Sequence, residues 1–238
     1  MPEVIVTLRE REDLDEMIAS LPNLNIVRIT TDWFHYDEGQ ELTMRLIPML
    51  PQCPSLTHLD ISHDDFGDAG AEALAVVLPH LTSLADLKLL SQEIGAVGMR
   101  RLAAVLPQCT SLARLNLGHN EIGYEGLGRL TAVLPQCRSL AHLWLEINDF
   151  GDQGAQLLAD ALPQCASLTR LHLGFNMMGD TGFRCLVAVL PQCRSLRIMT
   201  VWGTGTNRKR HEVLSEYPQI QSWWTLDQFG TLRRRRSI

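Results

Sequence analysis

Apolar and polar positions along this chain follow a pattern that returns every 28 residues. A Leu-Pro pair opens each copy, and in most copies Gln-Cys follows it. Counted from the proline as position 0, apolar residues stand at +5, +8 and +10 in every copy. A fixed period of this length is typical of proteins built from stacked repeats. The prolines that open the copies are Pro51, Pro79, Pro107, Pro135, Pro163 and Pro191.

Two periodicities within each copy predict one strand and one helix. The apolar residues at +8 and +10 alternate with polar ones, which predicts a short strand with one apolar face. Leucines at +23 and +27 are spaced like the inward stripe of a helix. Because one copy cannot bury its own apolar face, we expect the copies to stack and to align their leucines in a continuous core.

Polar residues and glycines mark the turn between strand and helix. Asn at +13 is predicted to bond backbone groups where the chain leaves the strand. Aspartates at +17 are predicted to cap the helix that follows, and the glycines at +16 and +19 are predicted to serve turns. The asparagines are Asn120, Asn148 and Asn176, and the aspartates are Asp68, Asp152 and Asp180.

The pattern resembles the leucine-rich repeat, in the ribonuclease-inhibitor-like subclass with long, helix-containing repeats. The resemblance implies an α/β fold, a right-handed curved solenoid with parallel strands on its concave face and helices on its convex face. Geometry favours the same curvature, because strands lie about 4.8 Å apart and helices about 8–10 Å apart. We predict an N-terminal cap over residues 1–21 and about seven repeats over residues 22–218, the first and last of them degenerate. A C-terminal cap and basic tail follow over residues 219–238.

The two ends of the chain depart from the repeat. In the first copy, Val27 and Ile29 are predicted to take positions +8 and +10, and the aromatic turn after them is either local core or a contact loop. An apolar segment near the C-terminus is predicted to cover the last repeat, with partner binding as the alternative; its residues are Ile220, Trp223, Trp224, Leu226 and Phe229. Arg233 to Arg236 are predicted to be solvated and dispensable for folding. A nuclear-import signal, a membrane contact and a nucleic-acid tether are alternative roles for them.

Composition narrows the class of protein. The net charge of −6 gives no overall sign of nucleic-acid binding. No apolar run approaches the roughly 20 residues of a membrane span, and the N-terminus lacks a signal-peptide pattern. Five of the six cysteines stand at +2, which favours buried, reduced thiols over disulfides. We therefore expect a monomer in a reducing compartment, the cytoplasm. The basic tail makes the nucleus an alternative location.

The chain carries no motif for catalysis or for cofactor binding. A P-loop, a nucleophile elbow, a zinc-protease helix, a paired Cys-x-x-Cys and a dinucleotide fingerprint are all missing from the sequence. His142 and His172 on neighbouring strands could approach a metal together with Glu146, but we interpret them as surface histidines. We expect no enzyme activity, no cofactor and no metal.

The strand positions that point away from the leucine core, +7, +9, +11 and +12, are the informative surface. In the N-terminal copies they are polar or charged, whereas the C-terminal copies place aromatic residues there with basic neighbours. Trp, Tyr and Arg dominate interface hot spots. The residues predicted to bind a partner protein are Arg114, His142, Trp144, Glu146, Ile147, Arg170, His172, Phe175 and Trp202.

These observations predict a non-enzymatic scaffold that binds a partner protein through the concave face. Two alternatives follow from the resemblance: a regulator of a small GTPase, since the subclass includes GTPase-activating proteins, and a substrate adaptor in ubiquitin ligation. The first typically carries an acidic tail, whereas this chain ends in a basic one. The second needs a ligase-binding domain, and the first 21 residues are too short for it.

Overall fold

Strand and helix alternate along the chain, and the strands join side by side in one sheet. The computed structural model describes residues 3–20, 25–32, 39–203 and 207–235. Within these residues the sheet has the strand order β1-β2-β3-β4-β5-β6-β7-β8-β10-β9. The parallel strands β1 to β8 are Glu3–Leu8, Asn25–Thr31, His58–Asp60, Asp86–Lys88, Arg114–Asn116, His142–Trp144, Arg170–His172 and Ile198–Thr200.

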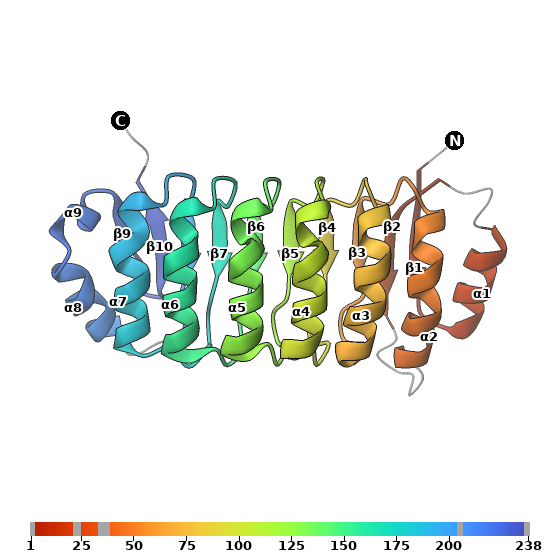
Figure 1. Ribbon diagram of the computed structural model, residues 1–238, viewed down its shortest axis with the longest axis horizontal. Coiled ribbons are helices and arrows are strands. Elements are labelled where there is room, and N and C mark those ends of the chain that lie inside the picture. The colour runs from red at the N-terminus through yellow and green to blue at the C-terminus, as the bar shows by residue number, and fades with distance from the viewer. Residues whose placement is uncertain (1–2, 21–24, 33–38, 204–206, 236–238) are drawn as a thin grey trace.

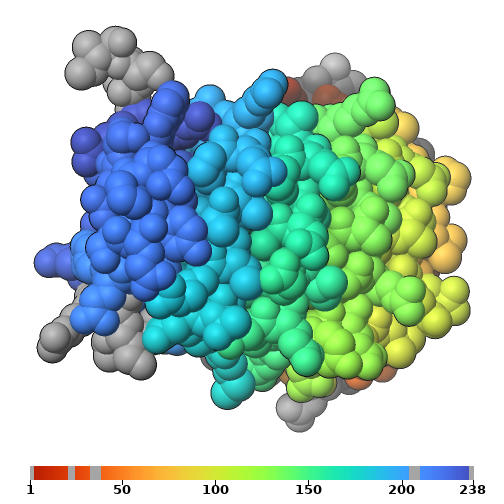
Figure 2. All heavy atoms as spheres, turned by 60° about the vertical axis from the view of Figure 1, so that its left-hand side comes forward, coloured from red at the N-terminus to blue at the C-terminus, as the bar shows by residue number. Residues whose placement is uncertain are grey.

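The helices form a second layer along one side of the sheet (Figure 1). Their order follows the chain from α1 beside the N-terminus to α8 and α9 at the other end, so each repeat contacts the next. The space-filling view shows the later repeats as contiguous bands (Figure 2). The prediction of an open α/β solenoid is therefore confirmed. Helices α1 to α9 are Arg11–Ser20, Gly39–Leu46, Gly67–Val77, Ala96–Val105, Gly123–Val133, Gly151–Ala161, Asp180–Val189, Asn207–Ser215 and Pro218–Gln221.

The core is the leucine ladder that the period predicts. The central residue of each short strand, at +8, pairs with its counterparts on both sides and is essentially inaccessible to solvent, as Leu115 and Leu143 illustrate. Helices α2 to α7 each lead into a 3-10 turn that contains a Leu-Pro pair, because proline lacks the amide hydrogen that would continue the helix. These turns, η2 to η7, are Ile47–Gln52, Leu78–His80, Leu106–Gln108, Leu134–Gln136, Leu162–Gln164 and Leu190–Gln192.

The buried asparagines join neighbouring repeats. The Asn120 side-chain amide donates to the carbonyls of Leu89, Leu117 and Gly118, at 2.8, 3.0 and 3.0 Å. Its Oδ1 accepts from the backbone amides of Gln92 and Ile94 in the preceding repeat. One side chain thus satisfies backbone groups of two repeats, which confirms the predicted role of position +13.

The predicted helix caps are wrong in one respect. Asp68 does not cap its own helix α3; its Oδ1 accepts from Gly95 N and Gly98 N, at 2.8 and 2.7 Å, at the start of α4. Asp152 serves α7 in the same way through Gly179 and Gly182. The aspartate lies in the first turn of its own helix, so it projects toward the first turn of the next one. Capping is therefore a contact between repeats.

The glycines at +19 also differ from the prediction, because they lie inside the helices. A methyl group at Gly154 would come within 2.5 Å of the Phe150 Cβ, and one at Gly126 within 2.8 Å of Ile122. This glycine lets the helix lie directly against the apolar residue at +15. The glycines at +16 do serve the turn, since Gly123 and Gly151 both have φ of +58°.

The first repeat is displaced by two residues from its predicted register. Arg28 pairs with His58 at +7, so Ile29 takes position +8 and the buried Thr31 takes +10. Val27 is only half-buried. The longer first repeat accounts for the shift, because Arg28 and His58 are 30 residues apart (58 − 28), whereas His58 and Asp86 are 28 apart (86 − 58). The aromatic turn with Trp33, Phe34 and Tyr36 lies outside the described residues.

The C-terminal segment covers the last repeat by extending the sheet. Strands β9, Trp224–Leu226, and β10, Thr231–Arg234, form an antiparallel hairpin whose β10 pairs with β8. Ile220, Trp224 and Leu232 are buried there. Trp223 and Phe229, in contrast, are 56% and 66% exposed, so the predicted apolar cover is only partly correct.

The prediction for the arginine tail is correct only in part, because the Arg233 and Arg235 side chains are exposed but the backbone of this segment belongs to the fold. Arg233 and Arg234 belong to β10, and Arg235 N donates to Trp223 O. The Arg234 guanidinium donates to the carbonyls of Cys193 and Arg194, at 3.1 and 2.8 Å, and lies 5.8 Å from the Trp223 ring. The edge of β8 has backbone groups that need hydrogen-bond partners, and the strand that contains these arginines provides them.

Candidate functional site

The side of the sheet opposite the helices, here called the sheet face, has two unlike halves. In the N-terminal half, charged side chains are paired with one another. Lys88 Nζ lies 2.8 Å from Asp60 Oδ2, and Arg114 Nε lies 2.9 Å from Asp86 Oδ2. Arg114 Nη2 also lies 3.4 Å from His58 Nε2. Arg114, predicted as a partner-binding residue, therefore belongs to this charged network and not to the aromatic group.

In the C-terminal half, Trp144 is the centre of a ring cluster. Its indole stacks on the His172 imidazole with centroids 5.2 Å apart and planes 4° from parallel. The edge contact with His142 has a centroid distance of 5.8 Å and an angle of 78°. Register explains the stack, because Trp144 in β6 pairs directly with His172 in β7. The indole is half-buried and presents one part of its surface to solvent.

Burial shifts the pKa values of two polar groups beside the indole. Burial, followed by the charges of Arg170 and His142, lowers the pKa of His172 to about 4. Burial also raises the pKa of Glu146, whose Oε1 lies 3.7 Å from His172 Nδ1. His172 is therefore neutral at physiological pH, and its Nδ1 lies 3.1 Å from the Thr200 hydroxyl. We name His142, Trp144, Glu146, Arg170 and His172 the aromatic cluster.

A second group lies where the strands turn toward the helices. Ile147 and Phe175, both at +12, have φ of 53° and 56°. Left-handed backbone is uncommon for side chains of this size and costs free energy. The earlier repeats place His63, Ser91 and His119 at this position. The apolar side chains of Ile147 and Phe175 have no evident role in the repeat itself.

Phe175 and Trp202 contact each other through their turns. Phe175 N donates to Trp202 O at 2.7 Å, and the Phe175 ring covers Gly203, where a methyl group would collide with it. Trp202 Nε1 lies 3.5 Å from the Thr231 hydroxyl of β10. A methyl group at Gly174 would lie 3.3 Å from Trp202 Cβ and 3.6 Å from Glu146 Cγ. Gly174 therefore lies between Trp202 and Glu146 of the aromatic cluster.

Two further exposed residues lie in this region: the sequence analysis missed Met177 and named Phe229 only as part of the C-terminal apolar segment. Met177 at +14 is 77% exposed, with φ of 56°, and Phe229 precedes the glycine that packs on the Trp202 ring. The signal for Met177 was in the sequence, since the same column is acidic in the four preceding repeats. Phe229 lies outside the repeats, so the repeat pattern could not predict its position. We name Phe175, Met177, Trp202 and Phe229 the apolar edge.

The cysteines at +2 are free thiols facing the helix ends. The Cys165 thiol donates to Ala161 O at 3.4 Å, and burial raises its pKa to about 12. The other four members of the column have pKa values raised to about 11, again by burial. These thiols are poor nucleophiles, since the thiolate is the reactive form.

No three His, Cys, Asp or Glu side chains in the described part of the chain are grouped so that they could hold a metal ion. Nor does any helix within it have the length and apolar character that crossing a membrane requires. His142 and His172, the histidines considered for a metal, each contact the indole of Trp144.

Comparisons with known proteins agree with the repeat. A family model described as Leucine Rich repeat matches residues 52–75, 108–130 and 164–187, each segment starting one residue after a repeat proline. No curated protein matches the chain. Among solved structures, the leiomodin-1 actin-binding site 2 (ABS2) aligns with a TM-score of 0.50 at 16% identity, over 79% of this chain and 98% of that chain. At this identity the likeness concerns the fold. The matched segments are leucine-rich repeats, and the fold is that of a leucine-rich-repeat solenoid.

Proposed function

We propose that this protein is a non-enzymatic scaffold that binds a partner protein through the C-terminal half of its sheet face. The observation that supports it most is the apolar edge. Phe175, Met177 and Trp202 are 55%, 77% and 42% exposed, and the first two stand in left-handed backbone. Exposure of such side chains and strained backbone both cost free energy, and neighbouring exposed apolar residues mark interaction sites.

The aromatic cluster adds the second part of an interface. Trp144 is held rigid by the His172 stack, so little side-chain freedom remains to be lost on binding. Arg170 and Glu146 surround it with polar groups. An aromatic anchor with a polar rim is the usual anatomy of an interface hot spot.

The experiment is affinity capture with the wild-type chain and two variants. Trp144→Ala should weaken capture of the partner by about 2 kcal/mol or more, because a central aromatic anchor is lost. Lys88→Ala is the matched control, since Lys88 occupies the same column two repeats earlier and is paired with Asp60. Melting curves are recorded for each variant. Capture that does not change in Trp144→Ala, or a large fall in its melting temperature, contradicts the proposal.

We also infer three finer properties. The helix-containing 28-residue repeats support the ribonuclease-inhibitor-like subclass, and the free cysteines support a reducing, intracellular compartment. The division into a cap over residues 1–21, repeats over 22–218 and a C-terminal cap over 219–238 is supported by the hairpin that extends the sheet. We propose a monomer, since β8 is covered by the chain's own β10.

A further inference from the structure

We propose that the partner presents acidic side chains from an extended segment, and that Arg170 and Arg233 bind them on either side of Ile198. This inference rests on the proposed function, because it names the chemistry of the partner for the same surface.

The fold brings the two arginines together from distant parts of the chain. Ile198 in β8 pairs with Arg170 in β7 on one side and with Arg233 in β10 on the other. Directly paired residues of neighbouring strands point to the same side of a sheet. Arg170, Ile198 and Arg233 therefore form one row on the sheet face, with the arginine backbones two strand spacings, or roughly 10 Å, apart.

Both arginines are exposed and neither forms an ion pair, although Arg233 interacts electrostatically with Asp227. The basic residues Lys88 and Arg114 of the N-terminal half are neutralised by Asp60 and Asp86. Across the described part of the chain, neither Arg170 nor Arg233 has a carboxylate within 4.0 Å. A guanidinium binds a carboxylate with two parallel hydrogen bonds, so the pair is suited to acidic side chains.

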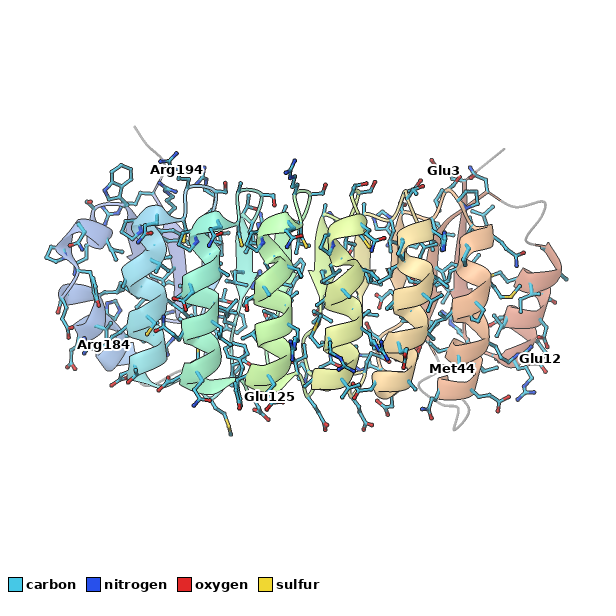
Figure 3. All side chains as sticks on the ribbon, viewed as in Figure 1. Glu3, Glu12, Met44, Glu125, Arg184 and Arg194 are labelled. Carbon is cyan, nitrogen blue, oxygen red and sulfur yellow. The ribbon has the colours of Figure 1, made fainter. Side chains whose placement is uncertain are left out.

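Further positive charge lies beside the row. Arg194, labelled in Figure 3 at the edge where helices lead into strands, is exposed, as are Arg197 and Arg235. Arg234 N donates to Arg197 O, which places these residues at one end of β8 and β10. The whole chain has a net charge of −6, so this end differs in sign from the rest. Such a local field attracts an acidic segment and speeds its encounter.

The distance to the apolar edge defines the length of the segment. Ile198 and Trp202 are four residues apart along the chain, which is about 13 Å in an extended strand. A partner in the same conformation would place an acidic residue at the arginines and, about four residues away, an apolar residue against Trp202 and Phe175. A helix would need about nine residues for the same distance. The extended form needs the shorter segment.

Charge at the strand-end edge argues against a nucleic acid. Position +14 of four successive repeats is acidic and exposed before the column changes to Met177; its members are Asp65, Glu93, Glu121 and Asp149. A phosphate backbone carries one negative charge per nucleotide and would be repelled all along this edge, whereas a peptide needs its acidic residues only at the arginines. An acidic, partly apolar peptide satisfies both surfaces.

The test uses a displayed library of random 12-residue peptides selected on the full chain. We expect enriched peptides to carry Asp or Glu four residues from Leu, Met, Phe or Trp. Binding of one such peptide, followed by fluorescence anisotropy, should weaken about tenfold or more in the double variant Arg170→Glu, Arg233→Glu, and also with added salt. Arg28→Glu is the control, because Arg28 is an exposed +7 residue of β2 in the same row.

Several results would overturn the inference: no enriched peptide, enriched peptides without acidic residues, or an equal effect of Arg28→Glu. Tighter binding of an oligonucleotide than of the peptide would do the same. So would wild-type dimers in sedimentation that the double variant abolishes, since the occupant would then be a second copy. If Arg170→Glu, Arg233→Glu lowers the melting temperature, the milder pair Arg170→Gln, Arg233→Gln replaces it. A captured partner that depends on Trp144 but not on the arginines would refute the acidic chemistry and leave the proposed function standing.

Discussion

Asp64 occupies the repeat position at which the later repeats place a buried asparagine, and we predict that Asp64→Asn stabilises the protein at neutral pH. The residue is 4% exposed. Its Oδ2 accepts from the Thr31 and Thr43 hydroxyls, at 2.8 and 2.6 Å, whereas its Oδ1 is buried with no hydrogen-bond partner. In Asn120 the corresponding group is an amide that donates to three carbonyls. An asparagine at position 64 can donate in the same way and carries no charge.

The magnitude follows from the pKa of Asp64. Burial raises it from 3.8 to about 6, although the two hydroxyl bonds act in the opposite direction. Between these values the folded protein holds a proton that the unfolded chain releases, so stability decreases as pH rises through this window. About two pKa units correspond to about 3 kcal/mol of lost stability above pH 6. The amide avoids this loss, and its hydrogen bonds add about 1 kcal/mol.

The assay is urea unfolding of both proteins between pH 4 and pH 8, followed by circular dichroism. The variant should gain about 3–4 kcal/mol over the wild type at pH 8, with the gain shrinking toward about 1 kcal/mol at pH 4. His172 acts in the opposite sense, because its lowered pKa makes stability fall as pH decreases from 6.5 toward 4. It is present in both proteins and cancels in the difference. A gain independent of pH, or a less stable variant at pH 8, would refute the reasoning.

Three further predictions concern packing. Gly154→Ala should destabilise the protein by about 1–3 kcal/mol, because its methyl group would lie 2.5 Å from Phe150 Cβ. The control Gly128→Ala, whose methyl group would meet a neighbour only at 3.5 Å, should stabilise the protein by about 0.5–1 kcal/mol. Thermal melts that rank the two variants equally would contradict this. Thiol labelling of the +2 cysteines should be slow in the folded protein and fast in urea, as the raised pKa of Cys165 requires; rapid native labelling of all five would disprove their burial. Deletion of residues 231–238 should lower the melting temperature and promote association, since it removes the buried Leu232 and exposes the edge of β8, and an unchanged melt would show that β10 contributes nothing.

Most of the repeat architecture could be predicted from the sequence alone. Position +8 is apolar in every copy, and stacking identical units places Leu115 beside Leu143 whatever the rest of the chain does. Trp144 and His172 were both predicted on the surface away from the leucine core, and because both stand at +9 the repeated register makes them direct neighbours. Within the repeats, one-dimensional order determines three-dimensional neighbours.

The remaining features depend on contacts between segments for which the period supplies no rule. The carboxylate of Asp68 reaches the next helix because of how adjacent helices are offset, which a pattern within one repeat does not contain. Arg233 was predicted in a solvated tail on the strength of its charge. It became a strand residue because the open edge of β8 needs hydrogen-bond partners, and burial of Leu232 accompanies that pairing. Only the tertiary structure could place Arg233 and Phe229 beside the repeats, since non-repeating residues are positioned by the surface on which they fold.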